Sequence, residues 1–293
     1  MGTGLLTYKL SVLENVMKCL NCHEEIPEHV RSCVVCGADA GYPNVRAALH
    51  SEETTALELR VKEAEENANL QGCDGILKSF RKDVANSSAV VCCSLGKLNE
   101  LASSDNLLYQ TFYQAIGSEA RLPEDNEYDT IREAVDSLFF PHYHEQIRFG
   151  ALSINRTGIS GYGYCMVLKE MAIKDRATVF EENLILFVKR LRIVAGDPLP
   201  LGCRAPWAKR DLLAVAKLGK RITPTTTQAE FSELLISSPT RVADIIEVHI
   251  YGPIHRRAIE HLSGREPRQG ADKVLLKSVI KKLKEIGVTA EIS

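Results

Sequence analysis

The sequence predicts an α+β protein in which a small cysteine-rich module precedes one larger mixed domain. Two Cys-x-x-Cys pairs lie close together near the N-terminal end, and farther along the chain short apolar runs of period two alternate with longer runs of helical spacing. We expect a zinc ribbon at residues 17–42, a linker helix at 43–72 and a larger mixed α/β domain at 73–293.

The most specific motif is a set of four cysteines, which are Cys19, Cys22, Cys33 and Cys36. Two such pairs at short separation can supply four thiolates to one tetrahedral Zn²⁺. A segment this short cannot bury a core of its own, so metal binding would supply its folding free energy. Because all four ligands are cysteines, no coordination position stays open, and we expect a structural zinc ion. The ribbon is not basic, which favours a protein-docking or structural role over contact with nucleic acid.

Composition is that of an ordinary globular protein, with 293 residues, 45% of them hydrophobic and 25% charged. No signal-peptide pattern is present, and no apolar run approaches the roughly 20 residues of a membrane span. We therefore expect a cytoplasmic protein with no membrane partner. Nine cysteines without a secretory context indicate thiols and metal ligands, not disulfides.

Residues 44–70 are rich in Glu and Ala, with Leu57, Val61, Ala64 and Ala68 at helical spacing. This apolar stripe is narrow and consists mostly of small side chains, so we expect a largely exposed helix. Such a helix could be a spacer between the two domains. It could also be one helix of a weak two-helix coiled coil, which would make the protein a homodimer through 44–70.

The C-terminal part of the chain is basic, because residues 204–293 contain 16 Lys and Arg against 10 Asp and Glu. If this part binds nucleic acid, Lys209, Arg210, Lys281 and Lys282 should lie on one surface. Solvated helix faces are the alternative interpretation.

The candidate site is built around a strand predicted at residues 246–251. Glu247, His249 and Tyr251 alternate there with apolar side chains, and Gly252-Pro253 then ends the strand. One interpretation is an edge strand with a solvated polar face. The other is a functional site, because a carboxylate, an imidazole and a phenol are aligned within about 14 Å of strand.

Two blocks of the larger domain carry a family resemblance. The first runs from Gly161-Tyr162-Gly163 through residues 166–169 to 176–183, and the second is residues 246–252. In this order they resemble ADP-ribosyltransferase-like domains of bacteria and phages. The resemblance implies a split sheet of that fold and NAD⁺ as a substrate. It also implies transfer of ADP-ribose to a macromolecular target, protein or nucleic acid, by a toxin or a phage-defence effector.

Cleavage of the nicotinamide–ribose bond builds positive charge on the ribose, which a carboxylate can stabilise. The resemblance assigns this role to Glu247, with His249 in place of the family's second glutamate. An Arg would bind the pyrophosphate bidentately, and an aromatic ring would stack on the nicotinamide. The candidates for NAD⁺ binding are Arg148, Arg176, Tyr162 and, in place of the family's Ser-Thr-Ser, Ser153 or Ser160.

Two alternatives stay open. Arg176 could form a salt bridge with Glu181 or Glu182 in place of a phosphate contact. At the level of function, the alternative is a non-catalytic zinc-ribbon interaction protein whose large domain binds protein or nucleic acid.

Overall fold

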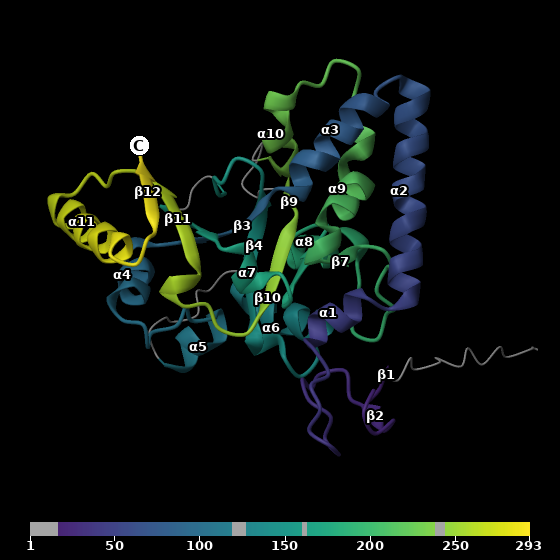
Figure 1. Cartoon of the computed structure of the whole chain (residues 1–293), viewed down its shortest axis with the longest axis horizontal. Coiled ribbons are helices and arrows are strands. Elements are labelled where there is room, and N and C mark those ends of the chain that lie inside the picture. Colours follow the sequence, from purple (N-terminus) through teal and green to yellow (C-terminus); the bar gives the residue numbers. More distant parts are fainter. Residues whose placement is uncertain (1–16, 119–126, 160–162, 238–243) are drawn as a thin grey trace, which may run out of the picture.

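The computed structural model describes residues 17–118, 127–159, 163–237 and 244–293. Within these residues the larger domain is built on an eight-stranded sheet of order β12-β11-β5-β3-β4-β10-β6-β7 (Figure 1). Neighbouring strands are antiparallel, except for the parallel pair β11 and β12. In sheet order the strands are β12 (Thr289–Ile292), β11 (Ile259–Gly264), β5 (Tyr164–Leu168), β3 (Ser88–Cys93), β4 (Ile147–Ser153), β10 (Glu247–Tyr251), β6 (Ala177–Phe180) and β7 (Arg204–Pro206).

Two further strand pairs are short. They are β1 (Met17–Lys18) with β2 (Glu25–Ile26) in the ribbon, and β8 (Ile236–Ser237) with β9 (Asp244–Ile245). The α-helices of the described residues are α1 (Pro43–Ala48), α2 (Ser51–Gln71), α3 (Asp74–Ala85), α4 (Leu95–Ser103), α5 (Phe112–Gly117), α6 (Glu127–Phe139), α7 (Glu170–Ile173), α8 (Leu184–Leu191), α9 (Arg210–Leu218), α10 (Phe231–Leu235) and α11 (Gly270–Lys284). Short 3₁₀ turns are η1 (His144–Gln146), η2 (Trp207–Lys209), η3 (Gly219–Arg221), η4 (Gln228–Glu230) and η5 (Arg256–Ala258).

The sheet separates two apolar cores. On one face the larger core contains Val248 and Ile250 of β10 together with buried side chains of α2, α3 and α9. On the other face a smaller core contains Ile147 and Phe180 with side chains of α6 and α8. The predicted mixed α/β architecture is confirmed, and so is the cysteine cluster near the N-terminal end. None of the described helices is long and apolar enough to cross a bilayer.

The helix predicted between the two domains is not largely exposed. α2 packs along α9, and its stripe of Leu57, Val61, Ala64 and Ala68 is buried in the larger core (Figure 1). Small residues allow this approach, because a Cβ added at Gly219 would lie only 2.9 Å from the Cβ of Ala64. The expectation of an exposed helix is therefore wrong. The stripe that suggested a homodimer through 44–70 is covered within the chain, and the dimer itself stays a prediction.

β10 is an interior strand, with β4 on one side and β6 on the other. Glu247, Val248, His249 and Ile250 are all buried, so both faces of the strand lie in the protein interior. The interpretation as an edge strand with a solvated polar face is wrong. A carboxylate and an imidazole that are removed from water require polar partners, and those partners define the candidate site.

The predicted basic surface is divided between the two edges of the sheet. Lys209 and Arg210 lie at the start of α9 beside β7, whereas Lys281 and Lys282 lie on α11, which packs on β12 (Figure 1). Arg210 is also only 7% exposed. The four residues therefore do not share the one surface that nucleic-acid binding would require, and the dispersed cations fit solvated helix faces.

Candidate active site and metal centre

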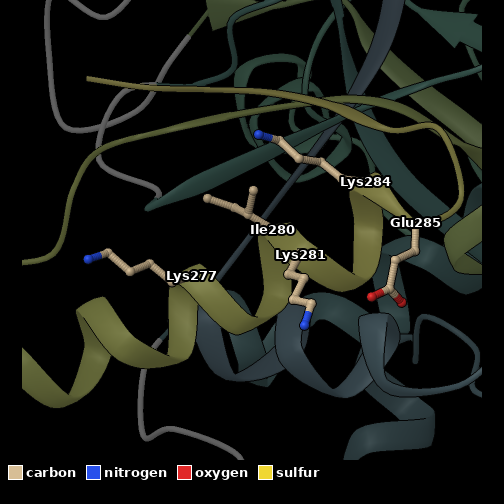
Figure 2. A pocket seen from close by; sticks show the side chains of 5 residues that line it. All are labelled: Lys277, Ile280, Lys281, Lys284 and Glu285. Atoms are coloured by element: carbon tan, nitrogen blue, oxygen red, sulfur yellow. The ribbon is translucent and has the colours of Figure 1, made fainter.

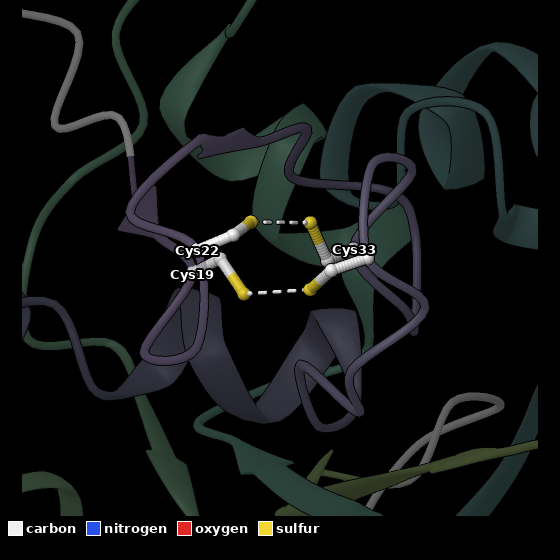
Figure 3. A group of neighbouring side chains, drawn as sticks. Cys19, Cys22 and Cys33 are labelled. Carbon is white, nitrogen blue, oxygen red and sulfur yellow. Dashed lines mark hydrogen bonds between the residues drawn. The ribbon is translucent and has the colours of Figure 1, made fainter.

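The four cysteines of the ribbon meet in space. Their sulfur atoms all lie within 4.8 Å of one another. The Sγ atoms are 3.5 Å apart for Cys19 and Cys36 and 3.5 Å apart for Cys22 and Cys33 (Figure 3). A tetrahedral Zn²⁺ with Zn–S bonds of about 2.3 Å separates its sulfurs by about 3.8 Å. As the spacing predicts, the four cysteines could hold a metal ion such as zinc.

Helix α1 connects the ribbon to the sheet through two polar side chains. Arg46 donates hydrogen bonds to four backbone carbonyl oxygens of the ribbon. Asn44, which is 3% exposed, donates from Nδ2 to the carbonyl oxygen of His249 at 3.3 Å. The ribbon is therefore tied to the strand that carries Glu247 and His249.

Glu247 is 4% exposed, and three polar groups hold its carboxylate. Asn183 Nδ2 donates to Oε1 at 2.8 Å, and the backbone amide of Leu184 donates to Oε2 at 3.3 Å. His249 Nε2 lies 3.0 Å from Oε2 and donates in the tautomer that carries its proton there. Leu184 begins α8 and Asn183 caps it, so the carboxylate lies at the N-terminal end of a helix, where the helix dipole favours negative charge.

The imidazole of His249 is 2% exposed and packs among three aromatic rings. Its centroid lies 5.0 Å from that of Phe140, 5.4 Å from that of Phe149 and 5.9 Å from that of Phe180. These rings fix the plane of the imidazole and the direction from which Nε2 meets Glu247. His249 is therefore a positioning residue for the carboxylate.

Asp136 on α6 is a third buried titratable group close to Glu247 and His249. It is 3% exposed and accepts a hydrogen bond from the hydroxyl of Tyr113 at 2.8 Å. Burial raises the pKa of Asp136 from its ordinary value of 3.8 to about 6. The negative charge of Glu247 also raises this pKa, whereas the positive charge of Arg132 lowers it.

Replacing Asp136 by Asn is expected to stabilise the protein above pH 7. The folded carboxyl keeps its proton up to about pH 6 and the unfolded one only to about pH 4, so its ionisation destabilises the fold as the pH rises between them. A shift of about two pKa units corresponds to at most about 3 kcal/mol. Asn retains an oxygen that accepts from Tyr113. Denaturant unfolding of both proteins from pH 4 to 8 measures the difference.

The stability difference between Asp136→Asn and the original chain should become small near pH 4, where the folded carboxyl is protonated and only about half of the unfolded carboxyl is ionised. The exposed Asp175 gives a matched control, because Asp175→Asn makes the same change outside the core. A difference that is constant across the pH range would show that the ionisation of Asp136 does not oppose folding.

The two arginines predicted to bind the pyrophosphate do not lie beside Glu247. Arg148 on β4 pairs with Ile250 on the neighbouring strand β10. Its side chain therefore lies on the opposite face of the sheet from that of Glu247. Its guanidinium donates to the carbonyl oxygen of Gln146 at 2.9 Å, and also to Gln114 Oε1 and Tyr109 O.

Arg176 lies at the other end of β10. Its guanidinium donates to the carbonyl oxygens of Ala172 and Tyr251. Glu247 is four residues from Tyr251, or about 13 Å along the strand. Both of these hydrogen bonds of Arg176 are with the backbone, and the ion pairs of Glu181 and Glu182 are made by Arg60 and Arg190.

Ser153 is brought to the same end and face of the sheet as Glu247. Ala151 pairs with Glu247, and Ser153 follows two residues farther along β4. The Ser153 hydroxyl donates to the carbonyl oxygen of Thr157 at 2.7 Å and so closes the start of the glycine-rich turn. The other two candidates in that turn, Ser160 and Tyr162, lie outside the described residues.

Cys92 and Cys165 form a disulfide between directly opposed positions of β3 and β5, with Cα atoms 4.2 Å apart. Gly158 packs on it so closely that an added Cβ would lie 1.6 Å from the sulfur of Cys165. The expectation of thiols without disulfides is wrong for this pair, because the strand register brings the two positions together. Glycine has no side chain, so the backbone at Gly158 can lie this close to the disulfide.

Two members of the site, Asn183 and Asp136, were not predicted. Asn183 directly precedes the apolar run at 184–188, which is a typical helix N-cap signal, so its position could have been found. Asp136 is a single acidic residue within an amphipathic helix. No local pattern distinguishes it from a solvated side chain.

A hollow of about 500 Å³ lies elsewhere, on α11. It is lined by Lys277, Ile280, Lys281, Lys284 and Glu285 (Figure 2). α11 packs at the β12 edge of the sheet, and the described lining of the hollow contains none of the predicted site residues.

Comparison of the chain with protein-family models and with curated proteins finds no match.

Proposed function

We propose that the ribbon holds one structural Zn²⁺ and that the larger domain transfers ADP-ribose from NAD⁺ to a macromolecular target. The zinc proposal is supported by the distances among the four sulfur atoms, which suit one tetrahedral ion. Four thiolates fill that coordination shell, so the ion would stabilise the ribbon without taking part in chemistry. The transferase proposal also rests on the resemblance of the two sequence blocks, which implies the split sheet of that family and a role in toxicity or phage defence.

The transferase proposal depends on one observation. The carboxylate of Glu247 is buried and is oriented by three polar groups. In the reaction, the bond between ribose C1′ and the nicotinamide nitrogen breaks, and its electron pair leaves with nicotinamide. Glu247 would stabilise the cationic ribose. A nucleophile of the target then bonds to C1′ and releases its proton to solvent. A fixed carboxylate in a water-poor site stabilises such a cation without reorganising first.

Ser153, which precedes the glycine-rich turn, lies at the Glu247 end of the sheet, which supports binding of the nicotinamide ribose there. Tyr162 in this turn is proposed to stack on the nicotinamide. The proposal gives no pyrophosphate role to Arg148 or Arg176, because their guanidinium groups are engaged at other positions.

The test uses the purified full chain with zinc bound. We expect it to bind NAD⁺ and to release nicotinamide, measured by chromatography, and to transfer label from radioactive NAD⁺ to protein or nucleic acid in a cell extract. The control variant Glu291→Gln removes one exposed carboxylate from the edge strand β12 and should keep full activity. A chain that neither binds nor consumes NAD⁺ would exclude the transferase, and the zinc-ribbon interaction protein would then be the better proposal.

A further inference from the structure

Three large apolar side chains lie on the surface of the ribbon beside its cysteines. Leu20, between Cys19 and Cys22, is 94% exposed. Val34 and Val35, between the other two cysteines, are 68% and 65% exposed. Because the four sulfurs meet within 4.8 Å, the two loops surround the same point. We call Leu20, Val34 and Val35 the knuckle patch.

The knuckle patch is not used to attach the ribbon to the larger domain. The ribbon contacts that domain through Tyr42, whose ring lies 5.6 Å from that of Tyr251, and through His29, whose ring lies 5.0 Å from that of His142. The ribbon extends from the body of the molecule next to α1 (Figure 1). Single exposed apolar residues are common on protein surfaces, but a module with so small a core rarely exposes three together without a partner.

The ribbon that carries the knuckle patch has a net negative charge. Residues 17–42 contain four acidic side chains against Lys18 and Arg31, and Arg31 is paired with Asp39 at 3.5 Å. The remaining acidic residues, Glu24, Glu25 and Glu28, are exposed. A Zn²⁺ with four thiolates would add a formal charge of −2, a contribution that rests on the zinc proposed above. This field repels phosphates and attracts Lys and Arg.

We propose that the knuckle patch is a docking surface for a peptide segment of another protein that carries apolar side chains flanked by Lys or Arg. The apolar residues of that segment would cover Leu20, Val34 and Val35, and its basic residues would face the exposed Glu24, Glu25 and Glu28 of the ribbon. This proposal is independent of NAD⁺ chemistry, since it concerns only the ribbon.

The probe is a library of displayed 12-residue random peptides, selected on the zinc-loaded full chain. The selection is repeated on the triple variant Leu20→Ser, Val34→Ser, Val35→Ser, which keeps all four cysteines. We expect the peptides selected on the original chain to be enriched in Lys, Arg and large apolar residues. A synthetic copy of one should bind the triple variant at least tenfold more weakly, because the contacts with three side chains are lost.

A matched control is Leu70→Ser, Met171→Ser, Val274→Ser, which removes three apolar side chains that are 89%, 81% and 70% exposed elsewhere. It should keep the affinity. Zinc content is measured for every protein. If the knuckle variant loses its metal, the variant Glu24→Lys, Glu25→Lys, Glu28→Lys decides, since reversing these three charges should also weaken binding at least tenfold. Peptides without basic and apolar bias would overturn the proposal. Equal binding of the peptide to the control and test variants would also overturn the proposal. Binding of an RNA or DNA oligonucleotide that depends on the knuckle patch would overturn it as well.

Discussion

Glu247→Gln is expected to slow NAD⁺ consumption by roughly two to three orders of magnitude, the usual loss when one preorganised electrostatic group is removed. Gln keeps the shape of the side chain but removes the charge that would stabilise the cationic ribose. That charge matters mainly in the transition state, so kcat should fall while NAD⁺ affinity changes little. Nicotinamide release gives kcat and KM, and calorimetric titration gives the affinity.

The same carboxylate also fastens α8 to the sheet through the amide of Leu184 and the side chain of Asn183. Gln offers one oxygen where the carboxylate has two, so we expect a stability loss of about 1–3 kcal/mol. The assay therefore runs well below the unfolding temperature of the variant. If Glu247→Gln lowers stability but leaves kcat unchanged, the carboxylate only anchors α8. Glu291→Gln should change neither quantity.

Cys36→Ser is expected to abolish zinc binding and unfold the ribbon. Zinc contributes roughly 10–16 kcal/mol to the folding of comparable peptide modules, and the core of this ribbon consists of Cys19, Ile26 and Cys33. The larger domain has its own cores and should stay folded. Elemental analysis measures the metal, and hydrogen exchange should show loss of protection confined to residues 17–42.

Cys36→His is the matched control, because a Cys₃His set is also a common zinc site. It should retain one zinc per chain and the protection of the ribbon. An original chain without stoichiometric zinc would refute the proposal. So would a Cys36→Ser chain whose ribbon stays protected, since the metal would then not supply its folding free energy.

The zinc ligands and most strands and helices could be predicted because their signals are local. Cys-x-x-Cys spacing is a property of adjacent residues, and the sulfur atoms meet as that spacing predicts. The run at 164–168 has no charged side chain, which suits a strand buried on both faces, and all five residues of β5 are buried. The Thr-x-x-Glu spacing of Thr227 and Glu230 is a local signal for a capping box, and the structure contains that capping box.

The position of residues 44–70 could not be predicted in the same way. A stripe of small side chains suits an exposed helix, and it suits equally a helix that packs closely on another. Gly219, more than 150 residues from Ala64 along the chain, decides between them, because its missing side chain leaves room for α2. No local pattern contains that information.

The sequence by itself determined the chemistry available at the candidate site, namely a carboxylate and an imidazole two residues apart on one strand face. Only the tertiary structure decided what surrounds them. The pairing register turns Arg148 to the opposite face, and the N-terminal end of α8 brings Asn183 to Glu247. The physical reason is that strand order and register are set by burial summed over the whole sheet, so a side chain's neighbours depend on residues far away in the sequence.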